Sequence, residues 1–200
     1  MRVHAVLFDL GGVILRTEYQ APREHLAERL HVTYEDLDQI VFASESARLA
    51  SLGSISTAQH WAAVISRLGL PPSETDQIRT EFFAGDVLDR DLLQFVRSLR
   101  PQRKTGLISN GWPDLREYMA RQHFEDAFDA VVISAEVGMM KPKREIYELA
   151  LHNLEVEPSQ AALVDDAPEN VRAASQLGMH GILFETTAQM RSELASLLDG

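Results

Sequence analysis

Polar side chains follow four short apolar segments of this 200-residue sequence, at the point where each segment ends. Sheets of parallel strands bind ligands at the carboxyl ends of their strands, so polar residues at four such ends would meet at one edge. One such residue alone is usually a helix cap or a turn residue, but four at one edge are difficult to explain as capping. The residues are Asp9, Ser109 with Asn110, Ser134, and Asp165 with Asp166, and Lys141 lies in the loop that follows Ser134.

These residue types together predict chemistry on a phosphate group. Two or three carboxylates cannot share a small site unless a cation joins them or one of them takes up a proton. An oxygen-rich site without cysteine or clustered histidine suits Mg²⁺, and an aspartate beside that ion can attack phosphorus to form an aspartyl-phosphate. Lys141 would offset the charge of the phosphoryl oxygens, while Ser109 and the backbone N–H groups after Asp9 would bind them.

The elements that would position these residues are five short apolar runs rich in β-forming residues. The runs are continuous rather than alternating, which is typical of strands covered on both faces. Helical patterns separate the last four runs, and this alternation predicts a parallel sheet with right-handed crossovers. We therefore expect an α/β fold, a Rossmann-like parallel sheet sandwiched by helices. The expected strands are Val3–Phe8, Lys104–Ile108, Ala130–Ile133, Ala161–Val164 and His180–Phe184.

The segment between the first two strands is far too long for a single crossover, and we find no convincing strand in it. Apolar residues at helical spacing, such as Trp61, Val64 and Ile65, instead predict amphipathic helices. We expect residues 16–88 to form a helical insert, an α-helical cap. Residues 1–15 and 89–200 would then form the α/β core domain.

Composition and charge exclude several classes of protein. Nineteen basic and thirty acidic residues give a net charge of −11, which argues against a nucleic-acid or acidic-membrane binder. There is no cysteine, which excludes disulfides, thiolate catalysis and zinc fingers. No apolar run approaches the ~18 residues that a membrane span requires. We expect a cytoplasmic protein, as a monomer or homodimer.

Four motifs in this order resemble those of the haloacid dehalogenase-like (HAD) hydrolase superfamily, in the branch that carries a helical cap after the first motif. Each motif alone is weakly specific, but the ordered set is strongly so, and the resemblance spans essentially the whole chain. It implies a hydrolase similar to sugar-phosphate phosphatase-like members. The motifs are FDLGGV at 8–13, LISNG at 107–111, GMMKP at 138–142 and VDDAPEN at 164–170.

The resemblance implies a metal site and a nucleophile. Asp9 resembles the nucleophile and is also similar to a magnesium ligand, and Gly11 would lend its backbone carbonyl to the same metal. Asp166 resembles the carboxylate ligand contributed by a later strand end. Asp165 would be a further or water-mediated ligand.

The phosphate-binding residues follow from the same resemblance. Ser109 and Asn110 resemble the phosphate-binding pair, and Leu10 and Gly11 would supply backbone N–H groups. Lys141 resembles the catalytic lysine that balances charge. The implied reaction is the Mg²⁺-dependent hydrolysis of a small phosphomonoester, and the implied partner is a small phosphorylated metabolite.

The sequence departs from the family pattern at Gly11, where most phosphatases and mutases of the superfamily carry a second aspartate. That residue protonates the leaving group and activates water, and losing a general acid–base group typically costs ~10²–10⁴ in rate. Four interpretations stay open. The chain is a slow phosphatase that uses water alone, or it prefers good leaving groups such as sugar-1-phosphates, acyl phosphates or aryl phosphates. Alternatively, another acid such as Glu18 substitutes, or the chain is a non-catalytic phospholigand-binding homologue.

A 2-haloacid dehalogenase is a further alternative, because it would use Asp9 on carbon without a metal. The retained pair Asp165 and Asp166 favours a metal, and hence phosphorus. Two other side chains have two interpretations each. Trp112 either borders the substrate or packs in the interior. Arg48 either contacts an anionic substrate or forms a surface ion pair with its neighbour Glu45.

Overall fold

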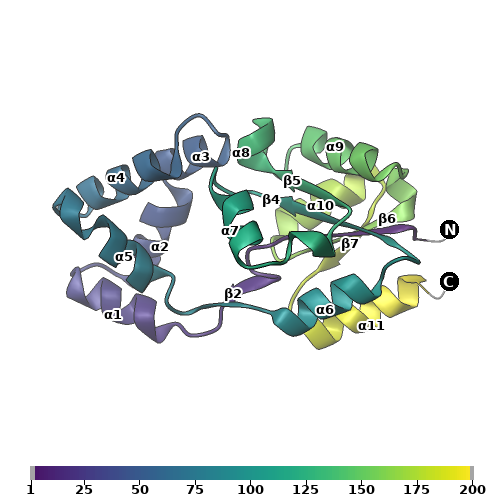
Figure 1. The fold of residues 1–200 in the computed structure, drawn as a ribbon, viewed down its shortest axis with the longest axis horizontal. Helices are drawn as coiled ribbons and strands as arrows, with labels where there is room; N and C mark the ends of the chain where they lie inside the picture. Colours follow the sequence, from purple (N-terminus) through teal and green to yellow (C-terminus); the bar gives the residue numbers. More distant parts are fainter. Residues whose placement is uncertain (1–2, 199–200) are drawn as a thin grey trace.

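The computed structural model describes residues 3–198, and within them it has a parallel sheet of five strands in the order β5-β4-β1-β6-β7 (Figure 1). The predicted α/β fold is confirmed. The first and last residues of each expected strand agree with those of an observed strand to within two residues. The three central strands β1, β4 and β6 are buried on both faces because helices cover both, as their continuous apolar sequences indicate, whereas the edge strands β5 and β7 are partly buried. The five strands are β1 (Ala5–Phe8), β4 (Lys104–Ser109), β5 (Ala130–Ile133), β6 (Ala161–Asp165) and β7 (His180–Leu183).

The register of the central strands aligns their carboxyl ends. Phe8, the last residue of β1, is paired with Leu107 of β4 on one side and Val164 of β6 on the other. The N–H of Asp9 continues this ladder by donating to the carbonyl of Val164 at 2.9 Å. The residues that follow β1, β4 and β6 therefore reach the same edge of the sheet.

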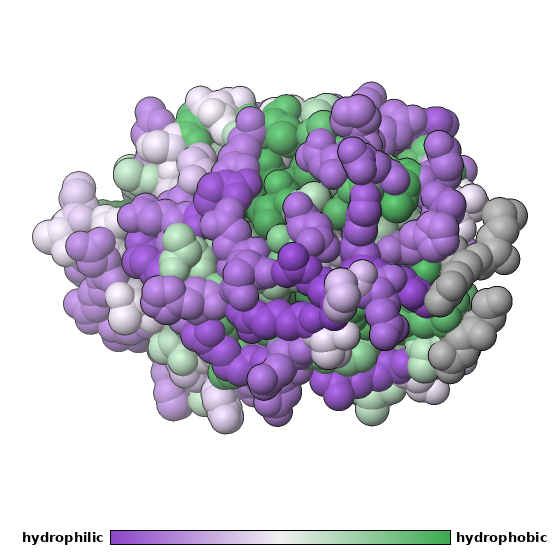
Figure 2. Space-filling model, turned by 45° about the vertical axis from the view of Figure 1, so that its right-hand side comes forward, coloured by the Kyte–Doolittle hydropathy of each residue, from purple (hydrophilic) through white to green (hydrophobic). Residues whose placement is uncertain are grey.

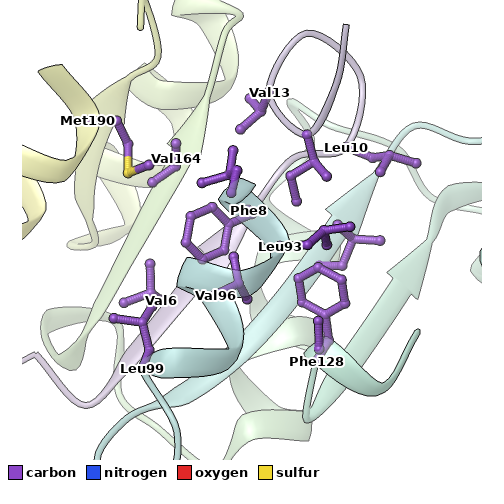
Figure 3. Close-up of a cluster of buried hydrophobic side chains, with 14 of the residues drawn as sticks. Val6, Phe8, Leu10, Val13, Leu93, Val96, Leu99, Phe128, Val164 and Met190 are labelled. Atoms are coloured by element: carbon purple, nitrogen blue, oxygen red, sulfur yellow. The ribbon is translucent and has the colours of Figure 1, made fainter. Parts of the chain in front are cut away.

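Strand β1 separates two hydrophobic clusters because its side chains alternate between the two faces of the sheet. Val6 and Phe8 pack with residues of α6 and α11 on one face, and Figure 3 shows Phe8 among Leu93, Val96 and other members of this cluster. Ala5 and Leu7 pack with residues of α9 and α10 on the other face. The flanking helices are α6 (Arg90–Ser98), α7 (Leu115–Arg121), α8 (Ser134–Val137), α9 (Arg144–Leu154), α10 (Pro168–Leu177) and α11 (Thr187–Leu198).

The helical insert has a hydrophobic cluster of its own, separate from the two that flank the sheet. Leu26, Leu37, Trp61, Ile65 and Phe82 are among its buried members. The helices of the insert lie beyond one edge of the sheet (Figure 1). They are α1 (Ala21–Arg29), α2 (Tyr34–Asp38), a π-helical turn (Gln39–Ala43), α3 (Glu45–Ser51), α4 (Thr57–Arg67) and α5 (Thr75–Phe82).

The expectation that residues 16–88 contain no strand is wrong. Strands β2 (Leu15–Thr17) and β3 (Asp86–Leu88) form an antiparallel ribbon through which the chain enters and leaves the helical insert. Three residues per strand are too few to show a periodic pattern, so the sequence carries no signal for them. Arg23 of α1 is 4% exposed and donates to Asp86 at 2.9 Å, which ties the insert to the ribbon.

Hydrophilic side chains predominate on the face of the molecule that Figure 2 shows, with smaller apolar areas between them. Among residues 3–198, no helix is both long enough and apolar enough to cross a bilayer.

Candidate active site

A buried lysine joins two carboxylates at the carboxyl edge of the sheet. The Nζ atom of Lys141 lies 2.9 Å from Oδ1 of Asp9 and 2.6 Å from Oδ2 of Asp165, and the lysine is 2% exposed. Asp166 completes the group, since one oxygen from each of the three aspartates lies within 4.8 Å of the others. The structure thus brings together four residues that the sequence analysis had selected from two strand ends and a loop.

Asp9 is held in a buried position directly after β1. Its Oδ1 atom accepts a hydrogen bond from the N–H of Leu10 at 2.6 Å in addition to the contact with Lys141. Burial raises the pKa of Asp9 to about 6, because desolvation of the carboxylate outweighs the opposing effect of Lys141, and the charge of Asp165 adds to the rise. The carboxylate is therefore ionised at neutral pH and can act as a nucleophile there.

Asp165 is fully buried, and both of its oxygens have partners. Oδ2 binds Lys141, whereas Oδ1 accepts from the N–H of Ala167 at 3.0 Å and from Nδ2 of Asn170 at 2.9 Å. These contacts fix the position of the Asp165 carboxylate, which in turn holds the ammonium group of Lys141 in place. Asn170 was not among the predicted site residues, although it belongs to the fourth motif, and its distance of five residues from Asp165 is the signal that could have found it.

Asp166 is more open than Asp165, and its position depends on Gly12. Gly12 has a φ of +73°, and a Cβ atom there would lie 2.0 Å from Oδ2 of Asp166. Only glycine therefore fits beside this carboxylate. Partial burial raises the pKa of Asp166, and the nearby charge of Asp165 acts in the same direction.

Gly11 has a different environment from its neighbour. A Cβ atom built on Gly11 meets no atom within 4 Å, and the residue is exposed. The position at which related phosphatases carry their acid–base aspartate is thus open space in this chain.

The loop that carries Lys141 is clamped by Asn110. The amide of Asn110 accepts from the backbone N–H of Lys141 at 2.8 Å and donates to its carbonyl at 3.0 Å. Both ends of the amide are used in this way, so Asn110 positions the lysine. Ser109 is buried at the end of β4, and the hydroxyl of Ser134 donates to the carbonyl of Gly111 at 3.2 Å, which braces the loop that follows β4.

The donor set fits a magnesium ion. Every acidic ligand candidate is a carboxylate, and oxygen donors of this kind are what Mg²⁺ prefers. Lys141 supplies one positive charge against three aspartates, so a cation is needed to complete the balance. Asp9, Asp165 and Asp166 are the carboxylates that could hold it.

Two contacts join the helical insert to the loop that follows β4 and the second motif. Asp114 accepts from the hydroxyl of Thr57 in α4 at 2.8 Å and from Nη2 of Arg79 in α5 at 2.7 Å. Trp112 packs against the aromatic side chains of the insert, with its ring centroid 4.5 Å from that of His60. Asp114, Thr57 and Arg79 were not predicted, because no local pattern marks partners that are distant in the sequence.

Two side chains that the sequence analysis weighed make other contacts. Glu18 forms an ion pair with Arg16, which also binds Asp89, so Glu18 is engaged beside the ribbon and is not one of the three clustered carboxylates. Arg48 forms the surface ion pair with Glu45 at 2.6 Å.

Comparisons with known proteins agree with this geometry. Residues 3–178 match the family model described as haloacid dehalogenase-like hydrolase. Over 97% of its length the chain is 26% identical to bifunctional epoxide hydrolase 2 of Rattus norvegicus, and it covers 38% of that protein. It is 28% identical to the sesquiterpene phosphatase astK of Aspergillus oryzae, over 97% of this chain and 96% of that one.

A solved structure shares the fold. The chain resembles an enzyme from Bacteroides thetaiotaomicron in complex with magnesium and inorganic phosphate, with a TM-score of 0.76 and 20% sequence identity. The match covers 92% of this chain and 96% of that one.

Proposed function

The chain belongs to the haloacid dehalogenase-like hydrolases, and on that premise we propose that it hydrolyses a small phosphomonoester through an aspartyl-phosphate on Asp9. The observation that carries the proposal is the buried Lys141, placed between Asp9 and Asp165 with Asp166 beside them. A lysine held in this way offers a fixed positive charge to the oxygens of a phosphoryl group.

The first step forms a bond between a carboxylate oxygen of Asp9 and phosphorus while the bond to the leaving oxygen breaks. Lys141 and the N–H of Leu10 both contact Oδ1 of Asp9, so we assign Oδ2 as the attacking atom. The hydroxyl of Ser109 and the N–H group of Gly11 would bind the phosphoryl oxygens, whereas the N–H of Leu10, which was also predicted for this role, already donates to Asp9. Water then hydrolyses the acyl phosphate and regenerates the carboxylate.

A bound Mg²⁺ would supply additional positive charge against the phosphoryl oxygens. Asp9, Asp166 and the Gly11 carbonyl would hold it. Asp165 would act on the reaction through Lys141, because its own oxygens are occupied by Lys141, Ala167 and Asn170.

The open space at Gly11 favours substrates with good leaving groups. No side chain at this position can protonate the departing oxygen, so the leaving group must carry its own negative charge. Acyl phosphates, aryl phosphates and sugar-1-phosphates meet this condition.

We further propose that residues 16–88 act as a cap over the site, with residues 1–15 and 89–200 as the core domain. The contacts of Asp114 with Thr57 and Arg79 support this division. On a second side, a Cβ atom on Gly53 of the insert would lie 2.1 Å from the carbonyl oxygen of Ala135 in α8, so the two parts are closely packed there too.

The test is turnover of acetyl phosphate and para-nitrophenyl phosphate with and without Mg²⁺, in the wild type and in Asp9→Asn. We expect magnesium-dependent turnover that Asp9→Asn abolishes, because the amide cannot form the acyl phosphate. Substantial activity in Asp9→Asn would remove Asp9 as the nucleophile. Binding of Mg²⁺ and phosphate without any turnover would indicate a non-catalytic homologue, and metal-independent release of halide from a 2-haloacid would indicate a dehalogenase.

A further inference from the structure

We propose that the leaving group of the substrate is apolar and that it lies against three aromatic side chains, Phe42, Phe83 and Trp112, here called the aromatic wall. This inference rests on the proposed phosphatase function and adds to it the chemical class of the group attached to the phosphate.

The aromatic wall begins where the phosphate-binding loop ends. Trp112 lies two residues after Asn110, whose side chain is bonded to the backbone of Lys141 on both sides. The intervening Gly111 is tightly packed, since a Cβ atom there would lie 2.2 Å from the side chain of Leu115. Trp112 is therefore held at a short distance along the chain from the residues that would bind the phosphoryl group.

The rings of the aromatic wall form one surface from two parts of the chain. The ring centroids of Phe42 and Trp112 are 6.0 Å apart with an interplanar angle of 28°, and that of Phe83 lies 6.5 Å from Trp112 and 6.2 Å from Phe42. Phe42 is 46% exposed, and Phe83 and Trp112 are half-buried. Ring surface thus remains exposed at Phe42 and partly exposed at Phe83 and Trp112, and an apolar group bound there can bury it.

Arg23, the cation that lies over the aromatic wall, is already paired, so its charge is not free to bind a second anionic or strongly polar group. Arg23 lies over Phe42, with its guanidinium carbon 5.5 Å from the ring centroid. Its nitrogens bind Asp38, Asp86 and the carbonyl of Phe82. The hydroxyl groups of a polyol would find few partners against such rings, and buried hydroxyl groups without partners are costly. The aromatic wall therefore narrows the leaving groups of the proposed function to those of acyl and aryl phosphates and sets aside the sugar-1-phosphates.

The test measures inhibition by n-alkylphosphonates, which carry the charge of a phosphate ester but cannot be hydrolysed. Inhibition constants for methyl-, butyl- and octylphosphonate are determined against acetyl phosphate turnover, at concentrations below those at which the inhibitors aggregate. Each buried methylene should lower the inhibition constant on the order of threefold, until the wall is covered. Phe42→Ala and Trp112→Ala should each reduce the ratio of the inhibition constant for methylphosphonate to that for octylphosphonate at least several-fold. Trp112→Phe should largely retain the wild-type ratio.

Val87→Ala is the matched control, because Val87 is another exposed apolar side chain, on the ribbon rather than in the wall. Its ratio should equal that of the wild type. A ratio near one in the wild type, or a ratio that Phe42→Ala and Trp112→Ala leave unchanged, would overturn the inference, as would equally tight binding of a polyhydroxylated phosphonate of the same length. The proposed function is tested separately: without any turnover, chain-length-dependent binding of the phosphonates by calorimetry would support the apolar site while contradicting the phosphatase.

Discussion

The structure leaves room at Gly11 for a larger side chain, such as one that could act as a general acid–base group. A Cβ atom there meets nothing within 4 Å, and the backbone does not have the positive φ of Gly12. We predict that Gly11→Asp increases the turnover of a simple alkyl phosphate by about 10²-fold, because it adds a general acid–base group beside the leaving oxygen. The measurement is kcat for an alkyl phosphate and for acetyl phosphate, whose good leaving group should gain much less.

Gly11→Asn and Gly11→Ala are the controls for this gain, since they fill the same space without a titratable group. Equal gains in all three variants would mean that rigidity at this position, rather than proton transfer, limits the reaction. No gain in Gly11→Asp would mean that another residue already supplies the acid.

His60 is a buried histidine whose ionisation opposes folding. Its Nδ1 atom lies 2.9 Å from the hydroxyl of Ser46, and burial lowers its pKa below the ordinary value of about 6.5. The unfolded chain therefore takes up a proton at a higher pH than the folded one, so the contribution of His60 to the free energy of unfolding falls as the pH drops below about 6.5.

We expect His60→Phe to remove this contribution. Urea unfolding of the wild type and of His60→Phe is compared at pH 7.5 and pH 5.5, and the loss of stability between the two should be smaller in the variant. Equal losses would show that His60 does not contribute to the pH dependence. The carboxylates that titrate in the same range are common to both proteins.

The strands of the sheet could be predicted from the sequence, whereas the ribbon could not. Ala130–Ile133 was predicted with the observed bounds, because an uninterrupted apolar run is typical of a strand in a parallel sheet that helices cover. Strands β2 and β3 have three residues each and pair with each other although the whole insert separates them in the sequence. No local sequence pattern records such a pairing. Site residues at strand ends could likewise be predicted from topology, but the clamp by Asn110 and the anchoring of Asp165 by Asn170 depend on tertiary contacts.

At the scale of helices, Asp114 is the residue that holds α4 and α5 against the loop after the phosphate-binding motif. We predict that Asp114→Ala lowers kcat/KM for para-nitrophenyl phosphate by about tenfold, because two hydrogen bonds worth ~0.5–1.5 kcal/mol each no longer hold the insert in place. The contact with the half-exposed Arg79 adds little on its own, so most of the effect should come from Thr57.

Thr57→Val tests this division of the effect, since it removes the hydroxyl and keeps the shape of the side chain. It should reproduce most of the loss, and the melting temperatures of both variants should stay close to that of the wild type. An unchanged kcat/KM in Asp114→Ala would show that docking of the insert does not limit the reaction.

For the whole molecule, the metal site exists only when the chain is folded, because Asp9 and Asp166 lie near opposite ends of the sequence. A ligand that binds only the folded state stabilises it by about 2.7 kcal/mol at one hundred times its dissociation constant. We therefore predict that Mg²⁺ raises the melting temperature of the wild type in a concentration-dependent manner and that EDTA reverses the effect. Asp166→Asn should abolish the rise, and a melting temperature that does not respond to Mg²⁺ in the wild type would contradict the proposed metal site.

The pairing of Thr17 with Asp86 has a consequence for how such a protein can be altered. The two ends of the insert are neighbours in an antiparallel ribbon, so its excision leaves a gap that a short turn can bridge, and a foreign helical module can be joined at the same two points. The aspartates, the lysine and their supports all lie outside that junction. If the insert determines which substrate is accepted, as proposed above, exchanging it at the ribbon would change substrate selectivity while leaving the clustered residues at the sheet in place.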